Sequence, residues 1–156
     1  MAITIKTKEE VGLLAEGGKL LALVLKQIAA AVAPGIATLE LDLLAEKLIV
    51  ESGGIPVFKG YRVPGVRKAY PATICISVND EVVHAIPRKE KVLAKGDIVS
   101  LDIGAKYKGL ITDMAITVGV GKISDELERL IRATKESLDL GIAAVRPGAH
   151  IGDIGH

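Results

Sequence analysis

Two aspartates occupy neighbouring apolar runs that are rich in β-branched residues. Asp102 lies in VSLDIGA and Asp113 lies in ITDMAIT, and the segment around Tyr107-Lys108-Gly109 between these runs is typical of a tight turn. A hairpin of this kind brings the two carboxylates into one small part of a sheet. Carboxylates that face each other repel, and burying them without a partner carries a high desolvation cost. A cation bound between them would remove both penalties.

The sequence leaves the register of this hairpin open. A two-residue turn at residues 107–108 would place Asp102 directly opposite Asp113 on one face of the sheet, with Cβ atoms roughly 5 Å apart. A bulge at Gly109 would shift that pairing by a residue. The distance between the two carboxylates is therefore not determined by the sequence.

The sheet face that carries Asp102 allows two interpretations. Strand alternation puts Asp102 on one face with Ser100 and Gly104, a set that fits a solvated surface as well as the floor of a cleft. On a solvated surface the two aspartates do no chemistry. On the floor of a cleft their hard oxygen atoms favour manganese, magnesium, iron(II) or cobalt over a structural zinc.

A histidine precedes the hairpin. His84 stands in SVNDEVVHAIP, after two valines and before a proline, which places it at a strand edge or in a turn. A lone histidine is more often a hydrogen-bonded structural residue, but its imidazole also makes His84 a candidate catalytic residue.

The first third of the chain is predicted to form two helices. Thr7 and Glu10 form a capping-box pattern and Pro34-Gly35 is a stop, so one helix is expected from about residue 8 to 33. Thr38 is the expected cap of a second helix that ends at residues 52–54 and packs against the first as an antiparallel hairpin. The inner stripe of the first helix is expected to hold Val11, Leu14, Gly18, Leu21, Leu25, Ile28 and Val32.

The pattern changes to strands at residue 55 and returns to a helix after residue 121. β-Branched residues and glycines predict strands over TICISV and over the two runs of the hairpin. Ser124 is expected to cap a third helix that ends at Pro147-Gly148. This helix would carry an apolar stripe of Leu127, Ile131, Leu138, Ile142 and Val145.

A segment of the first helix recurs near the end of the sequence. IAAAVAPG at residues 28–35 returns as IAAVRPG at residues 142–148, with leucines, a valine and the Pro-Gly pair at one constant offset. We therefore interpret residues 1–121 as a first repeat unit. Residues 122–156 are interpreted as the start of a second, truncated unit, completed by further chain or by another molecule.

The composition excludes several classes of protein. A chain of 156 residues that is 49% hydrophobic and 25% charged fits one globular α/β or α+β unit. A net charge of +1 gives no field that would attract nucleic acid or a membrane surface. The single cysteine, Cys75, forms no internal disulfide, and the sequence contains no secretory signal and no apolar run that could cross a bilayer, so the cytoplasm is expected.

Three segments together resemble the successive signatures of type I methionine aminopeptidases. They are SVNDEVVHAIP, KGDIVSLDIGAKYKG and ITDMAITVGVG, in the order and at the interval between aspartates that this family uses. Prolidases and other pita-bread peptidases share the aspartates but are less similar around TDMAIT. The resemblance covers the chain as an N-terminal half. It implies an α+β fold, half of a pita-bread fold, with helices packed on a curved and mainly antiparallel sheet.

The resemblance also implies roles for individual residues. Asp102 and Asp113 match two aspartate ligands of a dinuclear metal site, and His84 matches a histidine that contacts the scissile peptide. The implied cofactors are divalent ions, manganese, cobalt, iron(II) or magnesium, with two in a complete site. The implied substrate is a peptide or nascent protein with an N-terminal methionine, whose side chain would be surrounded by Phe58, Tyr61, Tyr70 and Cys75.

The sequence departs from the family pattern in three places. The stretch between Tyr61 and Tyr70 is longer than usual, Ala85 stands where a glycine is common, and the second half, with a histidine and two glutamates as further ligands, is absent. A monomer is therefore expected to lack complete catalysis. Two alternatives remain: a symmetric homodimer with four aspartate ligands, and a non-catalytic module that binds peptides or proteins.

Overall fold

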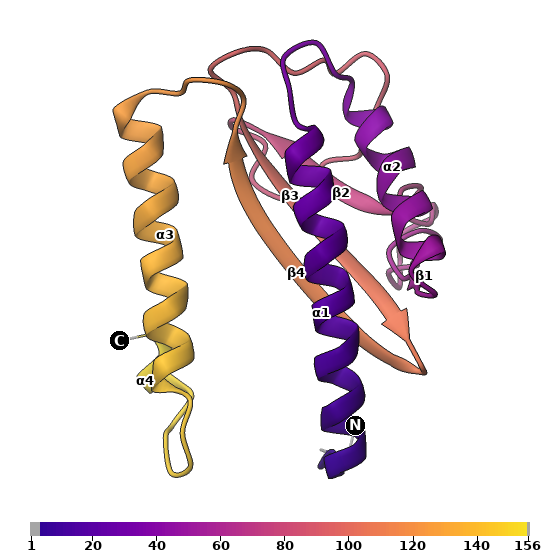
Figure 1. Cartoon of the computed structure of the whole chain (residues 1–156), viewed down its shortest axis with the longest axis vertical. Coiled ribbons are helices and arrows are strands. Elements are labelled where there is room, and N and C mark those ends of the chain that lie inside the picture. The colour runs from indigo at the N-terminus through magenta and orange to yellow at the C-terminus, as the bar shows by residue number, and fades with distance from the viewer. Residues whose placement is uncertain (1–3, 156) are drawn as a thin grey trace.

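The computed structural model describes residues 4–155, and its elements follow the predicted order of helices, sheet and helix (Figure 1). Residues 1–3, and residue 156 at the end of the predicted second unit, lie outside the described part. The elements are α1 (Lys8–Ala31), α2 (Thr38–Glu51), β1 (Ile55–Pro56), β2 (Ile74–Val78), β3 (Ile98–Tyr107), β4 (Leu110–Gly119), α3 (Asp125–Ala144) and α4 (Gly152–Gly155).

Helix α1 begins at the predicted capping box. The Thr7 hydroxyl accepts a hydrogen bond from the Glu10 amide at 3.2 Å, and the Glu10 carboxylate accepts one from the Thr7 amide at 2.8 Å. The buried stripe is shifted from the predicted one at its start, because Val11 is 54% exposed and Gly17, rather than Gly18, is buried. A Cβ atom at Gly17 would lie 3.4 Å from the Cβ atom of Tyr107, so a small residue lets α1 approach the hairpin closely.

Helix α2 begins one residue earlier than predicted, and its expected cap has another role. Ala37 is the N-cap residue, and its amide donates to the Glu40 carboxylate at 2.9 Å. The Thr38 hydroxyl instead contacts Arg88, donating to the carbonyl at 3.0 Å and accepting from the amide at 2.9 Å. The prediction that Thr38 caps the helix was therefore wrong: its hydroxyl joins α2 to a loop 50 residues away.

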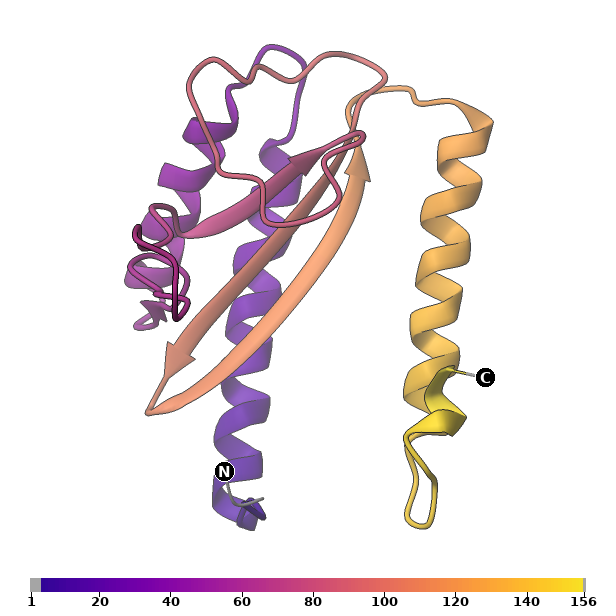
Figure 2. The ribbon, with the colours of Figure 1, turned by 180° about the vertical axis from the view of Figure 1, so that it is seen from behind.

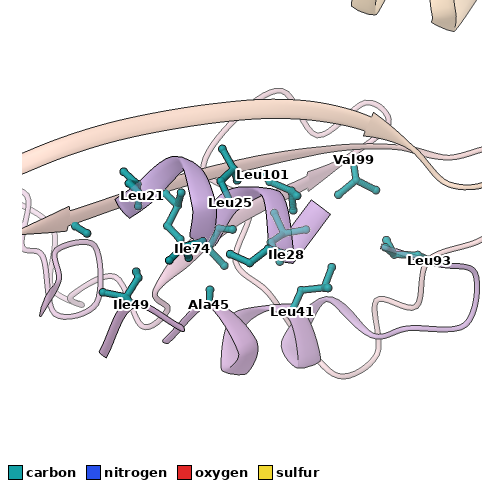
Figure 3. Packing of buried hydrophobic residues seen from close by; sticks show 14 of the residues in the cluster. Leu21, Leu25, Ile28, Leu41, Ala45, Ile49, Ile74, Leu93, Val99 and Leu101 are labelled. Atoms are coloured by element: carbon teal, nitrogen blue, oxygen red, sulfur yellow. The ribbon is translucent and has the colours of Figure 1, made fainter. Parts of the chain in front are cut away.

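The four strands form one antiparallel sheet in which β3 is central. β3 pairs with β1 and β2 along one edge and with β4 along the other. Helix α1 packs across one face, and Figure 2 shows the sheet from the opposite side. Side chains of α1, α2, β2 and β3 interlock to form the core shown in Figure 3, which includes Leu21, Ile28, Leu41, Ile49, Ile74, Val99 and Leu101. The predicted α+β class is confirmed.

Helix α3 stands away from the core. It begins at the predicted cap, where the Ser124 hydroxyl accepts from the Leu127 amide at 3.3 Å. None of its residues is buried, and both views show it separated from α1 and the sheet. Its predicted apolar stripe is therefore largely uncovered, with Leu138 and Ile142 each 61% exposed. Among residues 4–155, no helix is both long enough and apolar enough to pass through a membrane.

A buried carboxylate that the sequence did not indicate joins α2 to β2. Asp42 is 6% exposed, and its Oδ1 atom accepts hydrogen bonds from the amides of Thr73 at 2.8 Å and Ile74 at 3.2 Å. Burial raises the pKa of Asp42, and these two hydrogen bonds act against that increase. The carboxylate therefore sets the position at which β2 starts relative to the helix.

Replacing Asp42 with alanine is expected to lower the free energy of unfolding by about 3 kcal/mol, because two amide donors at the start of β2 lose a charged acceptor. Asp42→Asn keeps an oxygen acceptor and should cost about 1 kcal/mol or less. Urea unfolding followed by circular dichroism measures both changes. Asp139→Ala on the exposed α3 is the control, and equal losses for Asp42→Ala and Asp139→Ala would contradict this account.

Candidate functional site

The turn between β3 and β4 sets the register of the hairpin. Lys108 and Gly109 form a two-residue turn, with φ angles of 46° and 88°, and Tyr107 pairs with Leu110. Positive φ at both central residues matches the right-handed twist of the flanking strands. The turn therefore lies one residue later than the 107–108 turn considered from the sequence.

This register places the two aspartates on one face as diagonal neighbours. Asp102 pairs with Ala115, and Asp113 pairs with Gly104. The sequence left this register open, and the directly opposed pairing that a turn at residues 107–108 would give is not the one observed. Diagonal neighbours are farther apart than opposed residues, so this register does not force the two carboxylates into direct contact.

The environment of the two aspartates disfavours their charged forms. Burial raises the pKa of Asp102, the charge of Asp113 raises it further, and nearby His84 acts in the opposite direction. Partial desolvation also raises the pKa of Asp113, although this side chain is more exposed than Asp102. Without a cation, the fold therefore loses some stability when both carboxylates ionise.

Glycine in the middle of β3 allows another segment to cover the site. A Cβ atom at Gly104 would lie 2.8 Å from Val57 Cγ2 and 2.9 Å from Phe58 Cε1, so a side chain there would displace both. The Val57 amide also donates to the Gly104 carbonyl at 3.4 Å. The Phe58 ring thus lies close to Asp113, whose Oδ2 atom is 3.2 Å from the same Cβ position. A glycine within a β-rich run was the available sequence signal for this close approach.

On the edge of β3 opposite β4, Cys75 of β2 pairs with Asp102. The thiol is buried and free, and burial raises its pKa, with a smaller opposing effect from the neighbouring Tyr70 hydroxyl. Burial likewise raises the pKa of the Tyr70 phenol. Both groups therefore stay protonated at neutral pH and present a polarisable, uncharged wall beside the carboxylates.

The seven residues singled out from the sequence line one open hollow of about 1120 Å³ on the sheet face opposite α1. Asp102 and Asp113 lie in its floor and His84 comes from the loop after β2. Lining the same hollow does not by itself assign a role to any of these residues. The sequence-predicted residues in its lining are Phe58, Tyr61, Tyr70, Cys75, His84, Asp102 and Asp113.

Further residues of the hollow were missed by sequence reasoning. Val63, Val66 and Lys68 belong to the loop 61–70, and Ile111 extends the floor along β4. These side chains are mostly exposed apolar residues in a segment dense in proline, glycine and basic residues. The composition indicated a loop, but nothing in it indicated which side chains turn toward the aspartates.

The donor set fits part of a site for a hard divalent cation. Two carboxylates with raised pKa values share one face and open into the hollow. Such a pair gains stability from a bound cation, and oxygen donors suit magnesium, manganese or iron(II). Over the part of the chain that the structure describes, no cluster of three or more His, Cys, Asp or Glu side chains forms a fuller ligand set.

Comparison with known proteins gives consistent matches along the chain. Metallopeptidase family M24 matches residues 12–156. Methionine aminopeptidase 1 of Mycobacterium tuberculosis is 48% identical over 147 residues, or 94% of this chain and 53% of that protein. Methionine aminopeptidase of Aquifex aeolicus is 44% identical over 154 residues, or 99% of this chain and 60% of that protein.

A solved structure is similar throughout the chain. The crystal structure of methionine aminopeptidase from Thermotoga maritima has a TM-score of 0.91 at 37% identity, and the match covers 99% of this chain and 60% of that one. This likeness confirms the fold that the resemblance predicted. The chain spans 53% to 60% of the length of these three relatives.

Asp102→Asn is expected to stabilise the metal-free chain at neutral pH, by less than about 1 kcal/mol because the carboxyl is partly exposed. The folded-state pKa lies above the unfolded value of 3.8, so wild-type stability falls as pH rises from below 3.8 through the folded-state value. Thermal melts with a chelator should show the advantage of the variant disappearing below pH 3.8.

Asp97→Asn is the matched control, since it should change stability in the opposite direction. The Asp97 carboxylate accepts from the Asn79 amide group and the Ala94 backbone amide, both at 2.8 Å, and these bonds lower its pKa. This variant should therefore be less stable than the wild type at neutral pH. An Asp102→Asn chain that melts below the wild type at neutral pH would contradict the assigned repulsion.

Proposed function

This chain belongs to metallopeptidase family M24, and from that premise we propose that it supplies the aspartate ligands and the substrate pocket of a methionine aminopeptidase. Such an enzyme removes the N-terminal methionine of peptides and proteins. The observation that carries the proposal is the convergence of two aspartates, one histidine and an apolar wall in one hollow. The names of the relatives, of which the chain spans only part, support the same substrate.

Asp102 and Asp113 are proposed to hold a divalent cation between them. Their repulsion disfavours ionisation in the empty pair, and a cation turns the same arrangement into an attraction. When bound, such an ion supplies Lewis acidity at the scissile peptide group. His84 lines the same hollow, so we assign it the hydrogen bond that orients this peptide group.

The apolar wall of the hollow is proposed to bind the methionine side chain. Phe58 and Tyr70 meet edge to face, with centroids 6.5 Å apart and an interplanar angle of 88°. Thioether sulfur makes favourable contacts with aromatic rings, and the uncharged Cys75 thiol completes a polarisable surface. Glycine or a charged first residue would gain little in such a pocket.

We also propose that residues 122–156 belong to a second repeat unit. The support is that α3 buries none of its residues against the first unit while presenting a row of apolar side chains. These apolar side chains are available to pack against further structure, whether additional chain or a second copy of this one.

The free Cys75 thiol is in keeping with the cytoplasm, where nascent proteins with an N-terminal methionine are made.

Calorimetric titration with Mn²⁺ tests the metal site. The chain is expected to bind the ion, and Asp102→Asn should weaken binding about tenfold or more, since one of the two charged oxygen ligands is lost. Asp139→Asn, on the exposed helix α3, removes a carboxylate outside the hollow and should bind as the wild type does. Identical affinities for all three chains would show that the aspartate pair is not the binding site.

Binding of short peptides tests the pocket. In the presence of Mn²⁺, Met-Ala-Ser is expected to bind at least tenfold more tightly than Gly-Ala-Ser, because the methionine side chain removes its apolar surface from water. Phe58→Ala should abolish most of this difference. Chromatography measures the release of methionine from the peptide, and the mass of the protein in solution shows whether any active form is a monomer or self-associated. Equal affinity for the two peptides would reject the assigned pocket.

A further inference from the structure

Tyr70 links two parts of the pocket wall. The Gly60 amide donates to the Tyr70 carbonyl and the Tyr70 amide donates to the Tyr61 carbonyl, both at 2.8 Å, which closes the base of the loop 61–70. The Tyr70 ring packs edge to face on Phe58. The position of this ring therefore depends on the loop that surrounds the hollow.

The hydroxyl of Tyr70 connects this wall to the loop that carries His84. It lies 3.2 Å from the carbonyl oxygen of Ile74, the first residue of β2, and 3.1 Å from that of Ala85. Both partners are acceptors, so the phenol is the donor, and its single hydrogen is shared between the two carbonyls. Ala85 directly follows His84 in the chain, and the same hydroxyl therefore spans β2 and the histidine loop.

The backbone of His84 needs such support. Its φ angle is 58°, in the left-handed region that residues with a side chain rarely adopt. A conformation of this kind persists where the surroundings hold it. The Ile76 amide donates to the Ala85 carbonyl at 3.1 Å, and the Ala85 amide makes a longer contact of 3.4 Å with the Ser77 hydroxyl. The Tyr70 phenol is the one partner of Ala85 among these that also lines the hollow.

We propose that Tyr70 is a positioning residue: its hydroxyl, through the Ala85 carbonyl, holds the His84 imidazole at the hollow, and its ring transmits occupancy of the side-chain pocket to that histidine. The inference rests on the proposed function, which supplies methionine as the occupant. A ring displaced by a methionine side chain changes the direction of the hydroxyl and hence the position of Ala85. Binding at the wall and alignment of His84 are then coupled.

The test follows the imidazole signals of the full chain by NMR with bound Mg²⁺, a diamagnetic ion, as methionine is added. The sequence has three histidines, and His84→Gln assigns the relevant signal. Methionine should shift the His84 signal of the wild type. Tyr70→Phe, which keeps the ring, should shift and broaden that signal before methionine is added and make it unresponsive afterwards. The exposed His150 is the internal reference.

Tyr107→Phe is the matched control, because it removes a phenol hydroxyl from the far end of β3, outside the hollow. It should leave the His84 signal and its methionine response as in the wild type. In Tyr70→Phe, exchange of the Ile76 amide should also become faster by roughly tenfold, since its acceptor is held less firmly. A merely structural role of Tyr70 would lower the melting temperature without uncoupling His84 from methionine.

The outcomes separate the inference from the proposed function. If methionine binds neither chain, the proposed function fails. If it binds both and moves the His84 signal equally in both, Tyr70 does not position the histidine and the inference is overturned. Should Tyr70→Phe not fold, the wild type still decides: the Tyr70 ring and His84 signals must follow one methionine saturation curve, and a His84 response without a Tyr70 response overturns the coupling.

Discussion

The register of the β3–β4 hairpin is the constraint on which the rest of the site depends. The turn at Lys108-Gly109 puts Asp102 and Asp113 on the sheet face away from α1. A slip of one residue in a strand would exchange its two faces and turn an aspartate toward the helix. On the core face the same strands carry Leu101 and Met114, so burial of these side chains and exposure of the carboxylates enforce one register together.

The two faces of this sheet have opposite effects on the stability of the fold. On the helix side, wholly buried residues such as Leu21, Ile74 and Leu101 supply the apolar burial that stabilises the fold. On the other side, two carboxylates with raised pKa values reduce stability when no cation is present. A well-packed core thus supports a face whose two carboxylates lower stability, a combination that is common where proteins hold ions or substrates.

Loops carry the groups around the aspartates, and side chains from distant elements hold those loops. Thr38 of α2 forms two hydrogen bonds with Arg88, on the C-terminal side of the histidine loop. Asp42 holds the start of β2 through two backbone amides. The Tyr70 hydroxyl contacts the carbonyl of Ile74 at the same place and also the carbonyl of Ala85. Each contact joins segments far apart in the chain. Functional groups on loops can therefore keep fixed positions when the supporting hydrogen bonds come from rigid helices and strands.

The sequence by itself determined the features that a few neighbouring residues encode. The capping box at Thr7, the cap at Ser124, the helix and strand periods and the α+β class all follow from local hydrogen bonds and repeating patterns. The motifs around the aspartates also indicated the family that the comparisons support. Only the tertiary structure decided the one-residue placement of the turn, the role of Thr38, the buried Asp42 and which loop side chains line the hollow. These features depend on contacts between distant segments, and a short stretch of sequence is compatible with several such contacts.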